Sequence, residues 1–299
     1  MLSDDHLNYL TSHAISADLA EAVCETTPEG IGFNFTGPTG RTAQQVRLDN
    51  PRDPDAKYIG PAGVASVMPV PPGHDDAVHD LTKTLVMVEG SKGILAAASA
   101  LVGQRHDYAL VGLLGCWGWS HQQRPSEDLL GLPVRGRDVV VVLDADMSDN
   151  RAVWEAAQSL QDLLTSVRGA RSVKFRSLPG RDKEGTDDIL SMSDDPHETF
   201  VGLVDSATAR LGRRPAATST NRFFDNRGSL QVQTAMNILF GMYELAQTAE
   251  QTIAVYRDGL YRNGESREWQ GVVSRALGEQ FREAHYRTIN FEALTRTKQ

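Results

Sequence analysis

The run Val139–Leu143 is the sequence feature that most constrains the fold. Four valines and a leucine follow one another without a polar residue, which is typical of a strand buried on both faces of a parallel sheet. Asp144 and Asp146 come directly after this run. We therefore expect both carboxylates at the carboxyl end of a buried strand, the edge where open α/β sheets place their ligands.

Asp144 and Asp146 have two interpretations. Two like charges this close to a core cost several kcal/mol unless they are neutralised, and a divalent cation with oxygen ligands is the usual answer. Alternatively, Asp149 and Asn150 precede a helix-like segment over 151–167, so the acids fit a helix N-cap and a solvated side chain. This stretch alone gives the two interpretations about equal weight.

A second stretch favours the metal site. Residues 85–93 form a short apolar run that ends in Glu89 and Gly90, and an alanine-rich helical segment follows over 94–102. Two strands of one sheet that each deliver an acid at the carboxyl end predict a shared metal site. The ligands would be Glu89, Asp144 and Asp146.

The pairing of Glu89-Gly90 with Asp144-Ala145-Asp146 resembles the Toprim domain of bacterial-type primases, topoisomerases and some nucleases. The resemblance implies an α/β fold with a Toprim-type parallel sheet flanked by helices. We expect the Toprim-like domain over 83–204, after an N-terminal α+β module (1–82). A linker (205–221) and a mostly helical C-terminal module (222–299) would follow.

Residues 183–188 resemble the closing Lys-Gly-x-Asp-Asp motif of primase-type Toprim domains, with one extra residue before the glycine. The resemblance implies that Asp187 and Asp188 extend the metal site, although Asp188 fits a helix cap equally well. Lys92 lies three residues past Glu89, where a lysine reaches a phosphate at a helix N-terminus or is simply solvated.

The N-terminal 84 residues divide into two parts. Residues 5–24 have helical spacing, with Ser16 as the cap of a second short helix, and 25–84 have the short alternating runs of a β-rich module. The segments around Arg47 and Lys57 resemble those preceding Toprim-like domains in replication proteins of phages and integrative elements. This implies contacts with a nucleotide or template, but surface turns are the commoner role of such residues.

Trp117 and Trp119 follow an apolar strand that begins at Tyr108. Aromatic faces stack on bases, which would make Trp117 a nucleic-acid contact. Tryptophans are more often packing anchors, so we expect both to anchor the core or the loop first.

The C-terminal residues predict a long helix within 223–251, a β-hairpin over 252–264 that turns at 257–259, and a closing helix over 272–286. This order resembles the start of the domain that joins primase to helicase in phage, plasmid and poxvirus-type proteins. No Walker A motif is present, so the resemblance implies the front part of a longer primase-helicase, with a helicase as partner in the same chain or as a separate subunit.

Composition limits the remaining choices. No apolar run approaches the ~20 residues of a membrane span, and the N-terminus lacks the regions of a signal peptide, so we expect a cytoplasmic protein. Two cysteines exclude a Cys-based zinc ribbon. The net charge of −9 argues against an extended nucleic-acid surface, so contacts with nucleic acid would be local.

The resemblance therefore implies a primase-like nucleotidyltransferase that makes short primers on single-stranded DNA from nucleotides, and the carboxylates predict Mg²⁺ or Mn²⁺ as its cofactor. Glu89 would hold a second ion or act as general base. The alternatives are a metal-dependent Toprim nuclease and a non-catalytic adaptor that binds DNA or the helicase. The sequence does not determine the oligomeric state, and a homo-oligomer stays open.

Overall fold

The chain folds into two compact units, Met1–Ala216 and Ala217–Gln299, each with its own apolar core. The computed structural model describes residues 1–52, 57–60, 66–121, 124–178, 184–215, 223–224, 229–257, 260–262 and 267–297. None of the helices in these ranges combines the length and apolar character that a bilayer crossing requires.

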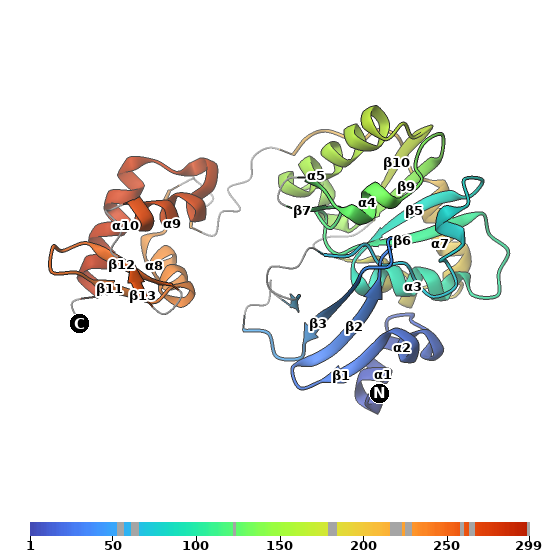
Figure 1. Cartoon of the computed structure of the whole chain (residues 1–299), viewed down its shortest axis with the longest axis horizontal. Helices are drawn as coiled ribbons and strands as arrows, with labels where there is room; N and C mark the ends of the chain where they lie inside the picture. The colour runs from blue at the N-terminus through green and yellow to red at the C-terminus, as the bar shows by residue number, and fades with distance from the viewer. Residues whose placement is uncertain are drawn as a thin grey trace. The chain divides into compact units, whose positions relative to one another are not determined.

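A parallel four-stranded sheet forms the centre of the first unit (Figure 1). Its strand order is β10-β9-β5-β6, with β5 at Thr84–Glu89, β6 at Tyr108–Leu113, β9 at Asp138–Leu143 and β10 at Ser172–Ser177. The predicted α/β class with a parallel sheet is therefore confirmed. The valine run of β9 is central and buried, as its composition predicts.

Helices cover both faces of this sheet (Figure 1). Side chains alternate along each strand, so Val86 and Val88 of β5 pack with α3 (Ser91–Leu101) and α7 (Pro196–Asp205), which contribute to the same apolar cluster. Leu85 and Met87 belong to the opposite cluster, with α4 (Glu127–Gly131) and α5 (Arg151–Asp162).

The neighbouring strands β5 and β9 form a topological switch point. The helix after β5, α3, lies on one face, whereas the helix after β9, α5, lies on the other. Chains that leave adjacent strands in opposite directions open a crevice at the carboxyl ends, and ligands of open α/β sheets bind there.

The N-terminal residues form two helices and an antiparallel sheet of order β1-β2-β3-β4. These elements are α1 (Asp4–Thr11), α2 (Ala17–Val23), β1 (Cys24–Thr27), β2 (Gly30–Thr36), β3 (Thr42–Leu48) and β4 (Tyr58–Ile59). Ser16 caps α2 by accepting the Leu19 N–H, as predicted. Leu10 and Phe33 share a core with Ile94 of α3, so the expected 1–82 and 83–204 modules lie within one compact unit.

Smaller elements complete the first unit: a turn at Ala77–His79, β7 (Ser120–His121), β8 (Arg124–Pro125), a turn at Ala145–Ser148, a π-helical turn at Leu163–Val167 and α6 (Thr186–Ser191). Residues 179–183, including Lys183 of the closing motif, lie outside the described residues. Thr208, within the expected linker, exchanges two backbone hydrogen bonds with Phe175 of the edge strand β10. Residues 216–221 of that linker are not among the described ones.

The second unit contains α8 (Val232–Met242), β11 (Leu245–Gln247), β12 (Ile253–Arg257), β13 (Leu260–Arg262), α9 (Arg267–Leu277), a turn (Gly278–Gln280) and α10 (Glu283–Arg296). The predicted hairpin is present as β12 and β13, although 258–259 of its turn lie outside the described residues. The helix predicted within 223–251 is present as α8, but it ends at Met242, because Tyr243 is extended and Leu245 pairs with Val255. The closing helix over 272–286 is wrong, since α9 ends at Leu277 and α10 starts at Glu283.

Candidate active site

Glu89 and Asp144 meet at the switch point. Glu89 is the last residue of β5, and its Oε2 accepts the backbone N–H of Asp144, directly after β9, at 3.2 Å. The backbone N–H of Cys116, in the loop after β6, donates to the same carboxylate. The fold therefore brings together the acids of the two strand ends.

Burial makes both carboxylates hard to ionise. It raises the pKa of Glu89, nearby Asp146 raises it further, and the two backbone donors offset part of this increase. Burial also raises the pKa of Asp144, and the charges of Glu89, Asp146 and Asp187 add to the effect. A cation placed among these carboxylates would remove this repulsion.

Asp146 lies in the turn that follows β9. Its Oδ2 accepts a hydrogen bond from the Asn150 side chain at 3.2 Å, and the Asn150 side chain in turn caps α5 through the Ala152 N–H. The predicted N-cap is thus made by Asn150, while Asp146 contributes charge near Glu89 and Asp144.

Glu89 and Asp144 line a cavity of about 490 Å³, within the size range of small-ligand sites. The lining combines acids, cations and aromatic side chains: Tyr9, His13, Arg47, Lys57, Tyr58, Glu89, Gly90, Lys92, Asp144, Gly185, Asp187 and Asp188. Seven residues predicted as site residues therefore line one cavity: Glu89, Lys92, Asp144, Asp187, Asp188, Arg47 and Lys57. The predicted Asp146 and Trp117 are not among its described lining residues.

Asp187 and Asp188 enter this cavity from the start of α6. Lys92, on the first turn of α3, places its Nζ 2.5 Å from Asp187 Oδ2. Asp188 Oδ2 accepts the Gly185 N–H at 2.9 Å, so the predicted helix-cap role of Asp188 is present. Its predicted role as a metal ligand stays a prediction.

Gly185 allows the closing segment to approach the acids. A β-carbon at this position would lie 2.8 Å from Asp187 Oδ1 and 3.5 Å from Asp144 Oδ1. Its φ of −98° is accessible to any residue, so the requirement for glycine is one of space. The Ala145 N–H donates to the Glu184 carbonyl at 3.1 Å and holds this segment over the end of β9.

The N-terminal helix contributes residues that the sequence did not indicate. His13, after α1, lies 3.8 Å from Asp187 and 3.9 Å from Asp188. Among the described residues, these three side chains form a group with ligand atoms within 4.8 Å of one another. Burial and the Lys92 charge lower the pKa of His13, which favours the neutral imidazole.

Trp117 lies in the loop after β6 and is 44% exposed. The centre of its ring lies 5.4 Å from that of Trp119, which is buried in the same apolar cluster as the side chains of α5. Trp119 is thus the packing anchor that the sequence predicts, whereas Trp117 presents an accessible ring next to Cys116, which contacts Glu89.

The donor set fits a hard divalent cation. Glu89 and Asp144 offer carboxylate oxygens, which Mg²⁺ and Mn²⁺ prefer. Glu89 is buried and Asp144 is half-buried, and neither has a basic side chain in direct contact among the described ion pairs. Glu89 and Asp144 are therefore the residues that would hold the cation, whereas Asp146, which is not among the described residues that line the cavity, stays a predicted ligand.

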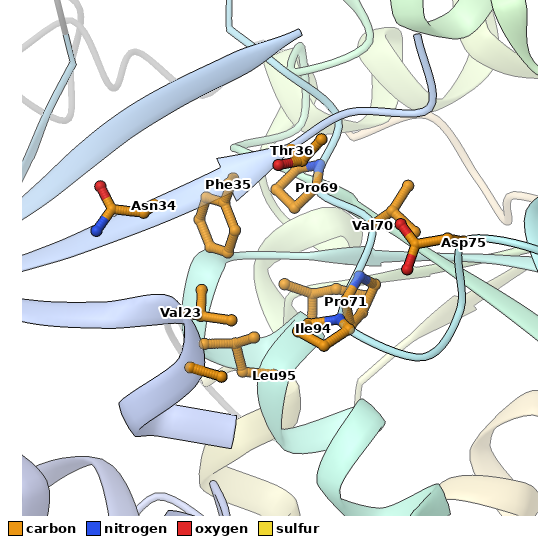
Figure 2. A pocket seen from close by; sticks show the side chains of 12 residues that line it. Val23, Asn34, Phe35, Thr36, Pro69, Val70, Pro71, Asp75, Ile94 and Leu95 are labelled. Atoms are coloured by element: carbon orange, nitrogen blue, oxygen red, sulfur yellow. The ribbon is translucent and has the colours of Figure 1, made fainter. Parts of the chain in front are cut away.

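A second cavity, of about 230 Å³, lies where α2, β2 and α3 approach residues 69–75. Phe35, Val70, Ile94 and Leu95 give it an apolar lining (Figure 2). Asp75 is the one charged side chain among its described lining residues, so this cavity lacks the groups that acid-base or metal chemistry requires.

Comparisons with known proteins give the following similarities. Residues 76–195 match the model of a domain of unknown function (DUF3854). No curated protein matches the sequence. Among solved structures, the chain is similar to the DnaG primase catalytic domain bound to ssDNA, with a TM-score of 0.43 and 16% identity over 97% of this chain and 78% of that chain.

Proposed function

We propose that the protein is a metal-dependent nucleotidyltransferase of the Toprim primase kind, which makes short primers for the replication of a phage, plasmid or genomic island. The observation that carries the proposal is the meeting of Glu89 and Asp144 at the switch point of a parallel sheet, in a cavity that also contains cations. Nucleotidyl transfer requires carboxylates that hold a metal ion and, beside them, basic side chains that bind phosphate.

The predicted acids are the metal ligands in this proposal. Glu89, Asp144 and Asp146 hold Mg²⁺ or Mn²⁺, and Asp188 extends the set. The cation supplies charge that favours ionisation of an attacking hydroxyl and stabilises the leaving pyrophosphate. Glu89 holds a second ion or accepts the hydroxyl proton, because burial raises its pKa toward neutral pH.

The remaining predicted residues bind the substrates. Lys92, Arg47 and Lys57 line the cavity and neutralise nucleotide or template phosphates. Trp117, with its exposed ring, stacks on a base of the single-stranded template. The second unit connects to a helicase, in the same longer chain or as a separate subunit.

A primer-synthesis assay tests this proposal. Wild-type protein is incubated with labelled nucleotides, single-stranded DNA and Mg²⁺ or Mn²⁺, beside Asp144→Asn and the control Asp149→Asn. Asp149 is exposed in the same turn, so its substitution makes the same change of charge. We expect short products from wild type and Asp149→Asn, and at least about a hundredfold less from Asp144→Asn.

Other outcomes identify other functions. Metal-dependent shortening of the template, without new products, would mean a nuclease. Neither new products nor shortening with wild type, when DNA or helicase still binds, would mean a non-catalytic adaptor. Equal product from wild type and Asp144→Asn would show that the cavity is not the catalytic site.

A further inference from the structure

Tyr9 of α1 lies among the basic side chains of the cavity. The Arg47 guanidinium carbon is 4.3 Å from the centre of the Tyr9 ring, and Lys92 Nζ is 5.5 Å from it. The His13 ring meets Tyr9 edge to face at 4.5 Å. One aromatic ring thus contacts cations from β3 and α3, two elements far apart in the sequence.

These contacts fix where the positive charge lies. An aromatic ring attracts a cation held over its face and restricts a long, flexible side chain to one region. Arg47 and Lys57 form no ion pair within the described part of the chain, so they retain their capacity for an anion. Lys92 contacts Asp187, which holds its ammonium at the boundary between the cations and the acids.

The cavity therefore selects a particular class of ligand. Arg47, Lys57 and Lys92, here called the cationic set, attract an anion, whereas Glu89 and Asp144 repel one unless a divalent cation lies between. A chain of phosphates that shares its negative charge between a bound cation and several basic groups satisfies both sets. A small monoanion contacts either the basic side chains or the bound cation, but not both.

We propose that Tyr9 is a positioning residue that arranges the cationic set to bind the polyphosphate of a nucleoside triphosphate. The inference rests on the proposed nucleotide chemistry and makes α1 part of the substrate site. The ring acts through the cations that it holds, so phenylalanine replaces it and an aliphatic side chain does not. The base of the nucleotide lies away from Tyr9, because Arg47 already covers this ring.

Binding of inorganic tripolyphosphate in excess Mg²⁺, measured by calorimetry on the full chain, tests the inference without any primer synthesis. We expect Tyr9→Leu to weaken binding about fivefold to tenfold, the range of a partly desolvated cation–π contact. Tyr9→Phe should bind within about twofold of wild type, because the ring face is retained. Arg47→Ala should lose at least as much affinity as Tyr9→Leu.

Two controls match these changes away from the cavity. Tyr256→Leu removes an exposed tyrosine of β12, and Arg105→Ala removes an exposed arginine that precedes β6, at the opposite edge of the sheet from Glu89. Both should bind tripolyphosphate as wild type does. Circular dichroism confirms that each variant is folded, and Tyr9→Met, which also lacks the ring, carries the test if Tyr9→Leu fails to fold.

Three results would overturn the inference: no binding by wild type, equal binding by wild type and Tyr9→Leu, or equal loss in Tyr9→Phe and Tyr9→Leu. Adenosine that competes as strongly as tripolyphosphate would also overturn it, because the site would then recognise the base. Failure of the proposed function is distinguishable. In that case no primers form, yet tripolyphosphate still binds in a Tyr9-dependent way.

Discussion

At the scale of single residues, the central feature is an excess of buried negative charge. The fold raises the pKa of Asp144, so it binds a proton more readily than the unfolded chain does. Such a group contributes its full stability below the ordinary carboxyl pKa of about 4, and this contribution is lost as the pH rises through the raised value. The metal-free protein therefore carries a penalty at neutral and higher pH.

Asp144→Asn removes this penalty. In the presence of a chelator we expect the variant to be more stable than wild type, with a gain that is small at pH 4.5 and at least about 1.4 kcal/mol at pH 8, the equivalent of one pKa unit. Urea unfolding at the two pH values measures it. Asp149→Asn, an exposed neighbour, should show no such dependence, and an equal gain at both pH values for Asp144→Asn would contradict the account.

Gly185 gives a second residue-scale prediction. Gly185→Ala places a methyl group 2.8 Å from Asp187 Oδ1, so the acid must move or the closing segment must shift. Overpacking of this kind costs about 1–3 kcal/mol of unfolding free energy, and primer synthesis should fall with it. Gly202→Ala on α7 meets no atom within 4 Å and is the matched control. Equal stability of both variants would show that the close approach at Gly185 is not required.

The sequence predicts the acids of this site better than its other groups. Glu89 and Asp144 follow apolar strands, and strand ends of a parallel sheet meet at one edge, so their convergence follows from local pattern. Tyr9 lies on α1 and His13 in the turn that follows it, and only the packing of this segment within the first unit brings them to Lys92 and Asp187. No local pattern records that long-range contact.

At the scale of elements, the strands were predictable where one face or both faces are buried. The β5 and β9 runs and the alternation of β2 and β3 give clear periodicities, and the structure has strands there. The end of α8 was not predictable, because Tyr243 and Leu245 continue a helical spacing, but Tyr243 is extended and Leu245 pairs with Val255 of β12. Tertiary pairing overrides local spacing at that point.

The start of β5 depends on one buried guanidinium. Arg137, 1% exposed, donates to the carbonyls of Val78 and Lys83 at 2.7 Å and of Ala77 at 3.1 Å. Arg137→Lys cannot reach all three carbonyls and should cost about 2–3 kcal/mol of unfolding free energy in urea. The exposed Arg135→Lys is the control. A loss below about 0.5 kcal/mol for Arg137→Lys would show that this network does not hold the strand.

At the scale of the whole molecule, the two units have separate cores. Among the described residues, two apolar clusters are made of first-unit side chains, and Trp269 and Val273 belong to a separate cluster of second-unit side chains. A fragment of residues 1–216 should therefore unfold cooperatively, with a midpoint within a few degrees of the corresponding transition in the full chain. An unfolded or aggregated fragment would show that the units depend on one another.

The central claim is that the acids at the ends of β5 and β9 hold one divalent cation between them. The most direct test is anomalous diffraction from crystals of the protein soaked in Mn²⁺, with Asp144→Asn crystals treated in the same way. We predict an anomalous peak in contact with the carboxylates of Glu89 and Asp144 in the wild type, and its loss in the variant. A wild-type crystal with Mn²⁺ bound elsewhere, and none between these two carboxylates, would contradict the account.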